Sequence, residues 1–191
     1  MNAAARAGAE IRALFAERGS RAYFGEPVTQ LDHALQTAWL AERSGASSAL
    51  IVAALCHDVG HLLHAHGEAC ADEGVDSHHE ALGGKFLGER FGREVAEPVA
   101  LHVAAKRFLC AKSRDYARSL SQASRASLDL QGGPMSPWEA ERFANKPFAG
   151  DAVALRRWDD AAKAVGLATP SLDHFLRHVD ECLPSRLAAH G

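Results

Sequence analysis

The sequence has no apolar run long enough to cross a membrane. Its longest uninterrupted run is Ala49–Cys56, which is far shorter than the roughly 20 residues that a transmembrane helix needs. The first twenty residues also lack a secretory hydrophobic segment, because Arg6, Glu10, Arg12 and Glu17 interrupt them. We therefore expect a cytoplasmic protein with no membrane association.

The chain also lacks a strong excess of either charge. Its formal net charge is −3, from 21 Lys plus Arg against 24 Asp plus Glu. The basic residues are scattered, so no block of them provides an electrostatic basis for binding nucleic acid. We expect no nucleic-acid partner, and nothing in the sequence indicates an obligate protein partner.

Cysteine is scarce and widely spaced. Cys56, Cys70, Cys110 and Cys182 form no CxxC pair, which argues against a disulfide scaffold. We expect all four to be reduced thiols. Histidine is abundant by contrast, with 11 residues, several of them beside carboxylates.

Alternation of apolar and polar residues over the length of a strand is absent, as are internal repeats and linkers. Apolar residues instead recur at helical spacing, as Leu31, Leu35, Ala38 and Trp39 do. The sequence therefore predicts an all-α fold, with residues 1–191 forming a single compact helical domain. Within it we expect an N-terminal helix at about 2–18, a loop at about 19–28, a helical core at about 29–164 and a C-terminal helix at about 170–184.

Capping residues mark several of the expected helix boundaries. Thr29 and Ser47 are suited to be N-caps, and Gly45 is suited to end the first of these two helices. Ser136–Glu139 has the pattern of a capping box with proline at the first helical position. Another helix is expected to open at Ser77.

The stretch AALCHDVGHLLH at 53–64 is the most unusual part of the sequence. An apolar helix ends here in an adjacent pair, His57 and Asp58, and His61 follows one turn later. Aspartate is almost never fully buried unless it is paired or bound to a metal. The stretch therefore favours a metal site, provided that other segments supply further ligands.

Other helices do supply such residues. A lone histidine is more often an ordinary polar residue than a ligand, and we interpret His64, His66, His174, His178 and His190 in that way. The ordered set of a histidine, a His–Asp pair, two further histidines and a late aspartate is more specific. Its members are His33, His57, Asp58, His79, His102 and Asp159.

Imidazole and carboxylate ligands without thiolate suit iron, manganese, nickel or zinc rather than copper(I) or a structural zinc ion. Six ligands are more than one metal usually takes while keeping an open position. Because a carboxylate has two oxygens, Asp58 is able to bridge two ions. We expect a dinuclear centre, with His33, His57 and Asp159 on one metal and His79 and His102 on the other.

This order of ligands resembles the HD-domain metalloprotein superfamily, an all-helical fold named after the paired His and Asp. Further motifs resemble the PhnZ-type enzymes within it. They are YFGE at 23–26, QLDHALQTAWLAERSGA at 30–46, AALCHDVGHLL at 53–63, HHE at 78–80, HVAAKR at 102–107, QGGPM at 131–135 and RRWDD at 156–160.

PhnZ-type enzymes are mixed-valent diiron oxygenases that cleave the C–P bond of 2-amino-1-hydroxyethylphosphonate to give glycine and phosphate. A near relative acts on the trimethylammonio substrate and gives glycine betaine. The resemblance implies two iron ions as Fe(II)/Fe(III), dioxygen as co-substrate and a small organophosphonate substrate. It also implies that the six residues named above are the iron ligands, with Asp58 shared between the two irons.

The resemblance also implies roles for residues around the metals. His61, Lys106, Ser124 and Arg156 would contact the phosphonate. The spacing agrees for three of them, since His61, Lys106 and Arg156 each lie within one turn of a proposed ligand. In the family, the residues that match Tyr23 and Glu26 in the loop at 19–28 control the access of dioxygen to one iron, so this would be a gating loop.

Two alternatives remain open from the sequence. A metal-dependent HD phosphohydrolase acting on a nucleotide or phosphate ester would use a similar set of ligands. A non-catalytic HD signalling module would have no need to keep all six ligands. The amine end of the substrate is also open, because Glu26 suits a primary or a quaternary ammonium equally well.

Overall fold

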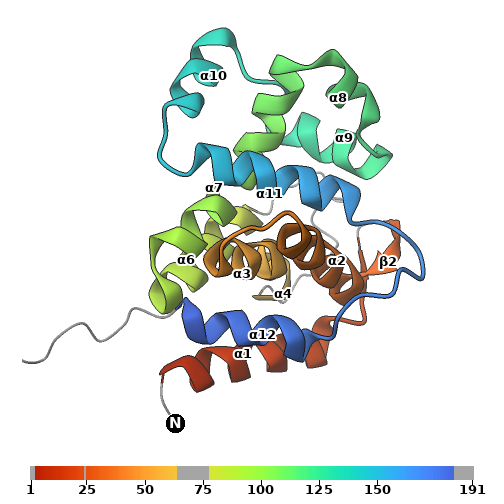
Figure 1. The fold of residues 1–191 in the computed structure, drawn as a ribbon. Helices are drawn as coiled ribbons and strands as arrows, with labels where there is room; N and C mark the ends of the chain where they lie inside the picture. The colour runs from red at the N-terminus through yellow and green to blue at the C-terminus, as the bar shows by residue number, and fades with distance from the viewer. Residues whose placement is uncertain (1–2, 24, 64–77, 183–191) are drawn as a thin grey trace, which may run out of the picture.

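Helices make up most of the computed structural model, which describes residues 3–23, 25–63 and 78–182. These residues contain eleven helices and one two-stranded antiparallel sheet (Figure 1). None of the described helices is long and apolar enough to cross a membrane. The predicted all-α fold is confirmed.

The helices follow one another closely along the chain. In order they are α1 (Ala3–Arg18), α2 (Gln30–Arg43), α3 (Ser48–Cys56), α4 (Val59–Leu63), α6 (His79–Phe91), α7 (Arg93–Lys112), α8 (Arg114–Ser119), α9 (Gln122–Leu130), α10 (Pro137–Ala144), α11 (Ala149–Ala161) and α12 (Leu172–Glu181).

Helix α3 lies at the centre of the main core. Every residue from Leu50 to Cys56 is buried, because α2, α7, α11 and α12 all pack around this helix. Ser47 is its N-cap, as predicted, and its side chain accepts a hydrogen bond from the Leu50 amide. A helix that is apolar on all sides has to be buried. Its C-terminal end therefore delivers His57 and Asp58 into the interior of the protein.

Helix α2 begins at a capping box, as its sequence predicts. The Thr29 hydroxyl accepts from the Asp32 amide, and the Asp32 carboxylate accepts from the Thr29 amide. Gly45 follows the helix with a φ of +74°, a conformation that glycine adopts without strain. The cap fixes where the helix starts, and His33 and Gln36 then face the core, where both are buried.

The first and last described helices lie side by side at one end of the molecule (Figure 1). Ile11 of α1 and Phe175 of α12 are both fully buried in the main core. At the opposite end, α8, α9 and α10 form a group beyond α7 and α11 (Figure 1). The metal-ligand candidates on α2, α7 and α11 therefore lie in the body of the molecule, between these two ends.

Two segments differ from the sequence prediction. The expected loop at 19–28 contains a hairpin, in which β1 (Ala22–Tyr23) pairs with β2 (Glu26–Thr29). Strands this short leave no alternating pattern to detect, which is why the sequence did not indicate them. The helical core, expected to extend to about residue 164, ends with α11 (Ala149–Ala161).

Other boundaries agree with the sequence or lie beyond what the structure describes. Ser136 forms the predicted capping box with Glu139 at the start of α10. The helix start expected at Ser77 lies outside the described residues, as does Cys70, and α6 is described from His79 onward. The other three cysteines are free thiols.

Candidate metal centre

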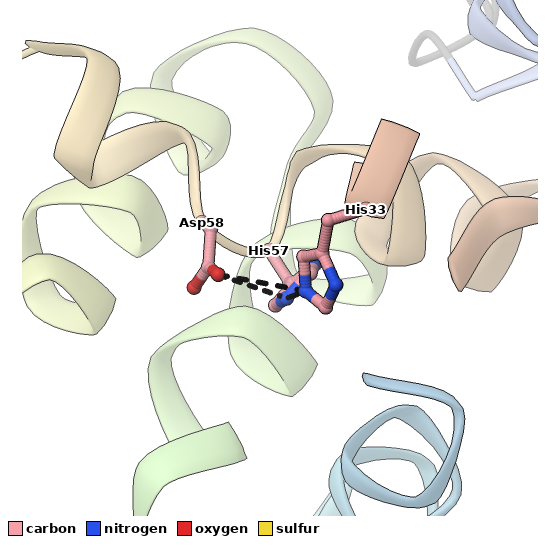
Figure 2. Close-up of side chains that lie close together, drawn as sticks. All are labelled: His33, His57 and Asp58. Atoms are coloured by element: carbon pink, nitrogen blue, oxygen red, sulfur yellow. Dashed lines mark hydrogen bonds and ion pairs between the residues drawn. The ribbon is translucent and has the colours of Figure 1, made fainter. Parts of the chain in front are cut away.

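All six predicted metal ligands come together in the interior. His33 lies on α2, His57 ends α3, Asp58 lies between α3 and α4, His79 begins α6, His102 lies on α7 and Asp159 lies near the end of α11. Figure 2 shows the Asp58 carboxylate and the rings of His33 and His57 directed toward one another. Five separate helices and a helix junction thus bring their polar side chains to one place.

One oxygen of Asp58 belongs to a first group of ligand atoms. Asp58 Oδ2 lies 3.2 Å from His57 Nε2 and 3.8 Å from His33 Nε2. Asp159 Oδ1 lies 3.3 Å from His33 Nε2 and 3.9 Å from His57 Nε2. The two imidazole nitrogens are 3.1 Å apart. Two oxygens and two nitrogens therefore surround one position.

The other oxygen of Asp58 belongs to a second group. Asp58 Oδ1 lies 3.4 Å from His79 Nε2 and 3.6 Å from His102 Nε2, and these two nitrogens are 3.1 Å apart. The carboxylate of Asp58 thus directs one oxygen to each group. This is the arrangement required of a carboxylate that bridges two metal ions.

Backbone hydrogen bonds fix which ring nitrogens carry lone pairs. Nδ1 of His33, His57 and His102 lies 2.9, 2.9 and 2.7 Å from the carbonyl oxygens of Ala162, Ala54 and Val99. A carbonyl oxygen only accepts, so each Nδ1 must donate, and each neutral ring then presents its Nε2 lone pair. The lone pairs of His33 and His57 face each other at 3.1 Å. Two such lone pairs repel unless a proton or a metal ion lies between them.

The pKa values of Asp58, His57 and His102 differ from the usual values of these side chains. Burial raises the pKa of Asp58, but His57 and then His79 hold it well below its usual value. Burial opposes a charge on His57, yet the Asp58 and Asp159 carboxylates raise the pKa of His57 to about 9. The two carboxylates therefore stabilise a positive charge at His57. Burial lowers the pKa of His102 to about 4, so its ring is neutral and ready to bind a cation.

The donor set fits two metal ions. Metal–nitrogen distances of about 2.0–2.1 Å place neighbouring ligand atoms roughly 3.0–3.4 Å apart, and most of the distances within each group lie close to this range. The ligand atoms are buried and of the imidazole and carboxylate types that suit first-row transition metals. The ligand atoms of His33, His57 and Asp58 lie within 4.8 Å of one another, close enough to share one metal ion. The same is true of the ligand atoms of Asp58, His61 and His79.

His61 therefore lies beside the second group, as its spacing predicts. Its ring on α4 stacks on the ring of His79, with centroids 3.9 Å apart. Its half-buried side chain is within reach of both the second metal position and anything bound there. The resemblance implied that His61 contacts the phosphonate. Its position also allows it to bind a metal ion directly.

Lys106, Ser124 and Arg156 lie close together, all of them buried. Lys106 Nζ donates to Ser127 Oγ at 2.7 Å, and burial, followed by the charge of Arg156, lowers the pKa of Lys106 to about 7. Arg156 Nη2 is 3.5 Å from Ser124 Oγ. The cluster combines two basic side chains with a hydroxyl, the types of group that bind anions, while Asp159 and Asp160 balance the charge of Arg156.

The guanidinium of Arg156 also binds Asp159, one of the predicted metal ligands. Its Nη1 lies 2.7 Å from Asp159 Oδ2, and the rest of the group is bonded to Asp160. Burial raises the pKa of Asp159, but Arg156 and His33 keep it well below its usual value. Arg156 therefore orients Asp159 with its other oxygen toward the histidines, a contact that the i, i+3 spacing of the two residues allows.

Tyr23 reaches the centre from the hairpin. Its hydroxyl donates to Asp58 Oδ2 at 2.9 Å, and its ring stacks on His33 with centroids 3.8 Å apart. Burial, reinforced by Asp58, raises the pKa of Tyr23 well above its usual value. Burial thus favours the neutral phenol, which lies beside the first group of ligands.

Glu26 has a partner that the sequence did not indicate. Lys163, just beyond α11, places Nζ 2.8 Å from Glu26 Oε1. Burial raises the pKa of Glu26, but hydrogen bonds from Lys163 and Ser121, together with the charge of Lys163, lower it below its usual value. Lys163 follows the RRWDD motif by three residues, and this nearness in the sequence was the one signal available.

Comparisons with known proteins agree with this geometry. The family model described as "HD domain" matches residues 31–128. The chain is 46% identical over 164 residues to hydroxymethylphosphonate dioxygenase of Gimesia maris, covering 85% of this chain and 82% of the relative. It is 39% identical over 179 residues to the glycine-betaine-forming [1-hydroxy-2-(trimethylamino)ethyl]phosphonate dioxygenase of Leisingera caerulea, covering 94% and 91%.

Proposed function

Because the chain belongs to the HD-domain family, and within it to the PhnZ-type phosphonate dioxygenases, we propose that it cleaves the C–P bond of a 1-hydroxyphosphonate with dioxygen. The products are phosphate and a carboxylate: glycine from the 2-amino substrate, glycine betaine from the trimethylammonio substrate and formate from hydroxymethylphosphonate. The observation that carries the proposal is the Asp58 carboxylate, which directs one oxygen to each of two ligand groups beside a buried cationic cluster.

We assign two iron ions, as Fe(II)/Fe(III), to these groups. His33, His57, Asp58 and Asp159 would hold one ion, and Asp58, His79 and His102 the other. The ions would supply redox chemistry with dioxygen and a Lewis acid for the substrate hydroxyl. Lone pairs aimed inward from His33, His57 and His102, each fixed by a carbonyl, support this assignment.

The phosphonate group is assigned to His61, Lys106, Ser124 and Arg156. Burying the charge of Lys106 is costly, and a bound dianion would offset that cost. Because the pKa of Lys106 is lowered to about 7 by burial and by Arg156, an adjacent dianion would favour its protonated form. These residues would bind and orient the substrate with its C1 carbon toward the metals.

Oxygen-dependent release of phosphate tests the proposed reaction. The iron-loaded protein is expected to release phosphate from 1-hydroxyphosphonates in air and to release none under argon. The matching carboxylate should appear in equal amount, which phosphate assays and NMR of the products will measure. Release of phosphate from phosphate esters under argon would instead identify an HD phosphohydrolase.

Replacing Tyr23 with phenylalanine is expected to change the resting iron spectrum. The Tyr23 hydroxyl already lies 2.9 Å from Asp58 Oδ2, and a nearby metal ion would offset the burial that keeps the phenol protonated. We expect the visible absorption of a phenolate bound to iron to disappear in Tyr23→Phe. The other tyrosine supplies the control: Tyr116 bonds to Asp160, so Tyr116→Phe should leave this absorption in place. An unchanged spectrum in Tyr23→Phe would refute ligation by Tyr23.

A further inference from the structure

The ion pair between Lys163 and Glu26 is largely enclosed. The two side chains are 15% and 13% exposed, and Nζ lies 2.8 Å from Oε1. Lys163 Nζ also lies 3.1 Å from Ser121 Oγ and 3.3 Å from Ser124 Oγ. All three hydrogens of the ammonium thus have an acceptor, so its position is well defined.

The backbone around Lys163 is fixed to α2 on both sides. The carbonyl of Ala162 accepts from His33 Nδ1 at 2.9 Å. The buried amide of Gln36 donates to the carbonyl of Ala164 at 2.8 Å and accepts from its N–H at 2.9 Å. These bonds therefore hold the backbone at Lys163 in a defined position beside α2.

The pair connects the metal centre with the anion cluster. Glu26 lies opposite Tyr23 in the hairpin, and Tyr23 bonds to Asp58. On the other side, Ser124 Oγ lies 3.3 Å from Lys163 Nζ and 3.5 Å from Arg156 Nη2. A phosphonate held by Ser124 and Arg156, with its C1 hydroxyl at the metals, would have this pair as its neighbour.

Lys163 changes what Glu26 offers to a substrate. A free glutamate would attract an ammonium group, but here the carboxylate is already neutralised by a cation. A substrate ammonium would need to displace Lys163 or to lie near it, and like charges brought together cost several kcal/mol. A trimethylammonium group has no N–H and is unable to replace the hydrogen bond that Lys163 donates.

We propose that Lys163 is a specificity-determining residue that favours 1-hydroxyphosphonates without a cationic substituent, such as hydroxymethylphosphonate, over their 2-amino and 2-trimethylammonio counterparts. This inference rests on the proposed function and deepens it by naming the substrate class. Membership of the family does not decide the question by itself, because the names of the two dioxygenases cover substrates with and without a cation.

Turnover and binding of three substrates test the proposal in the iron-loaded full chain. The unmodified protein is expected to show a kcat/KM for hydroxymethylphosphonate at least about 10-fold above that for either cationic substrate. Lys163→Gln removes the charge and frees the Glu26 carboxylate, so it should shift this ratio toward the cationic substrates by about 10-fold, or roughly 1.4 kcal/mol. Dissociation constants measured under argon should shift in the same direction, independently of turnover.

Two further variants test whether the effect depends on the position of Lys163 and on its ion pair with Glu26. Lys146→Gln removes the same charge at an exposed position and should leave the ratio unchanged. Glu26→Gln leaves Lys163 without its counter-ion and should increase discrimination against both cationic substrates. This second variant keeps the test decisive even if Lys163→Gln fails to fold.

The outcomes separate this inference from the proposed function. Equal or better use of cationic substrates by the unmodified protein would overturn the role of Lys163. An equal loss with all three substrates in Lys163→Gln would also overturn it, since Lys163 would then serve the phosphonate itself. If no substrate gave phosphate in air, the proposed function would fail. The binding preference under argon would still test the discrimination by charge.

Discussion

Replacing Asp58 with alanine is expected to remove bound metal from both positions of the centre. Asp58 Oδ2 faces His33 and His57, while Asp58 Oδ1 faces His79 and His102. Loss of a group that only supports a ligand typically lowers metal affinity 10- to 100-fold. Loss of a shared ligand should therefore lower it by more than about 100-fold at each position. Metal analysis of the purified variant after equilibrium dialysis measures this directly.

Asp159→Ala provides the matched comparison for Asp58→Ala. Asp159 contacts His33 and His57 and is held by Arg156, so its loss should weaken one position and leave the other occupied. Asp151→Ala, at an exposed position on the same helix, should keep both metals. Full retention of one metal ion in Asp58→Ala would show that Asp58 does not bridge.

Several of the predicted ligands could be placed from the sequence because they lie on elements with a strong local signal. The apolar run that ends at His57 requires a buried helix, and the Ser47 cap fixes its start. The Thr29 capping box fixes the register of α2 and hence the inward direction of His33. Local signals of this kind define the direction of a side chain without any knowledge of the tertiary structure.

The partner of Glu26 was not predictable for the opposite reason. Lys163 lies in an irregular segment after α11, and hydrogen bonds from His33 and Gln36, over 120 residues away in sequence, determine its position. Contacts between distant segments leave no periodic pattern in the sequence.

Gly60 lies where α4 packs against α6. A Cβ atom at this position would lie 2.0 Å from the carbonyl oxygen of His79 and 2.9 Å from its Cα. Both atoms belong to the backbone, so no side-chain rotation relieves the clash. Gly60→Ala is expected to lower the free energy of unfolding by about 3 kcal/mol. In a thermal unfolding experiment this corresponds to a midpoint lower by roughly 6–12 °C.

The same clash should affect the metal centre unevenly. Gly60→Ala has to displace the backbone of His79, which faces the second metal position, while His33 and Asp159 lie on other helices. Metal analysis should therefore show a larger loss from the second position than from the first. Gly88→Ala is the control, because its Cβ would meet Ala96 Cβ at an ordinary 3.5 Å. Alanine within α6 should stabilise the protein by about 0.5–1 kcal/mol. Unchanged stability and metal content in Gly60→Ala would mean that α4 and His79 are farther apart than the structure places them.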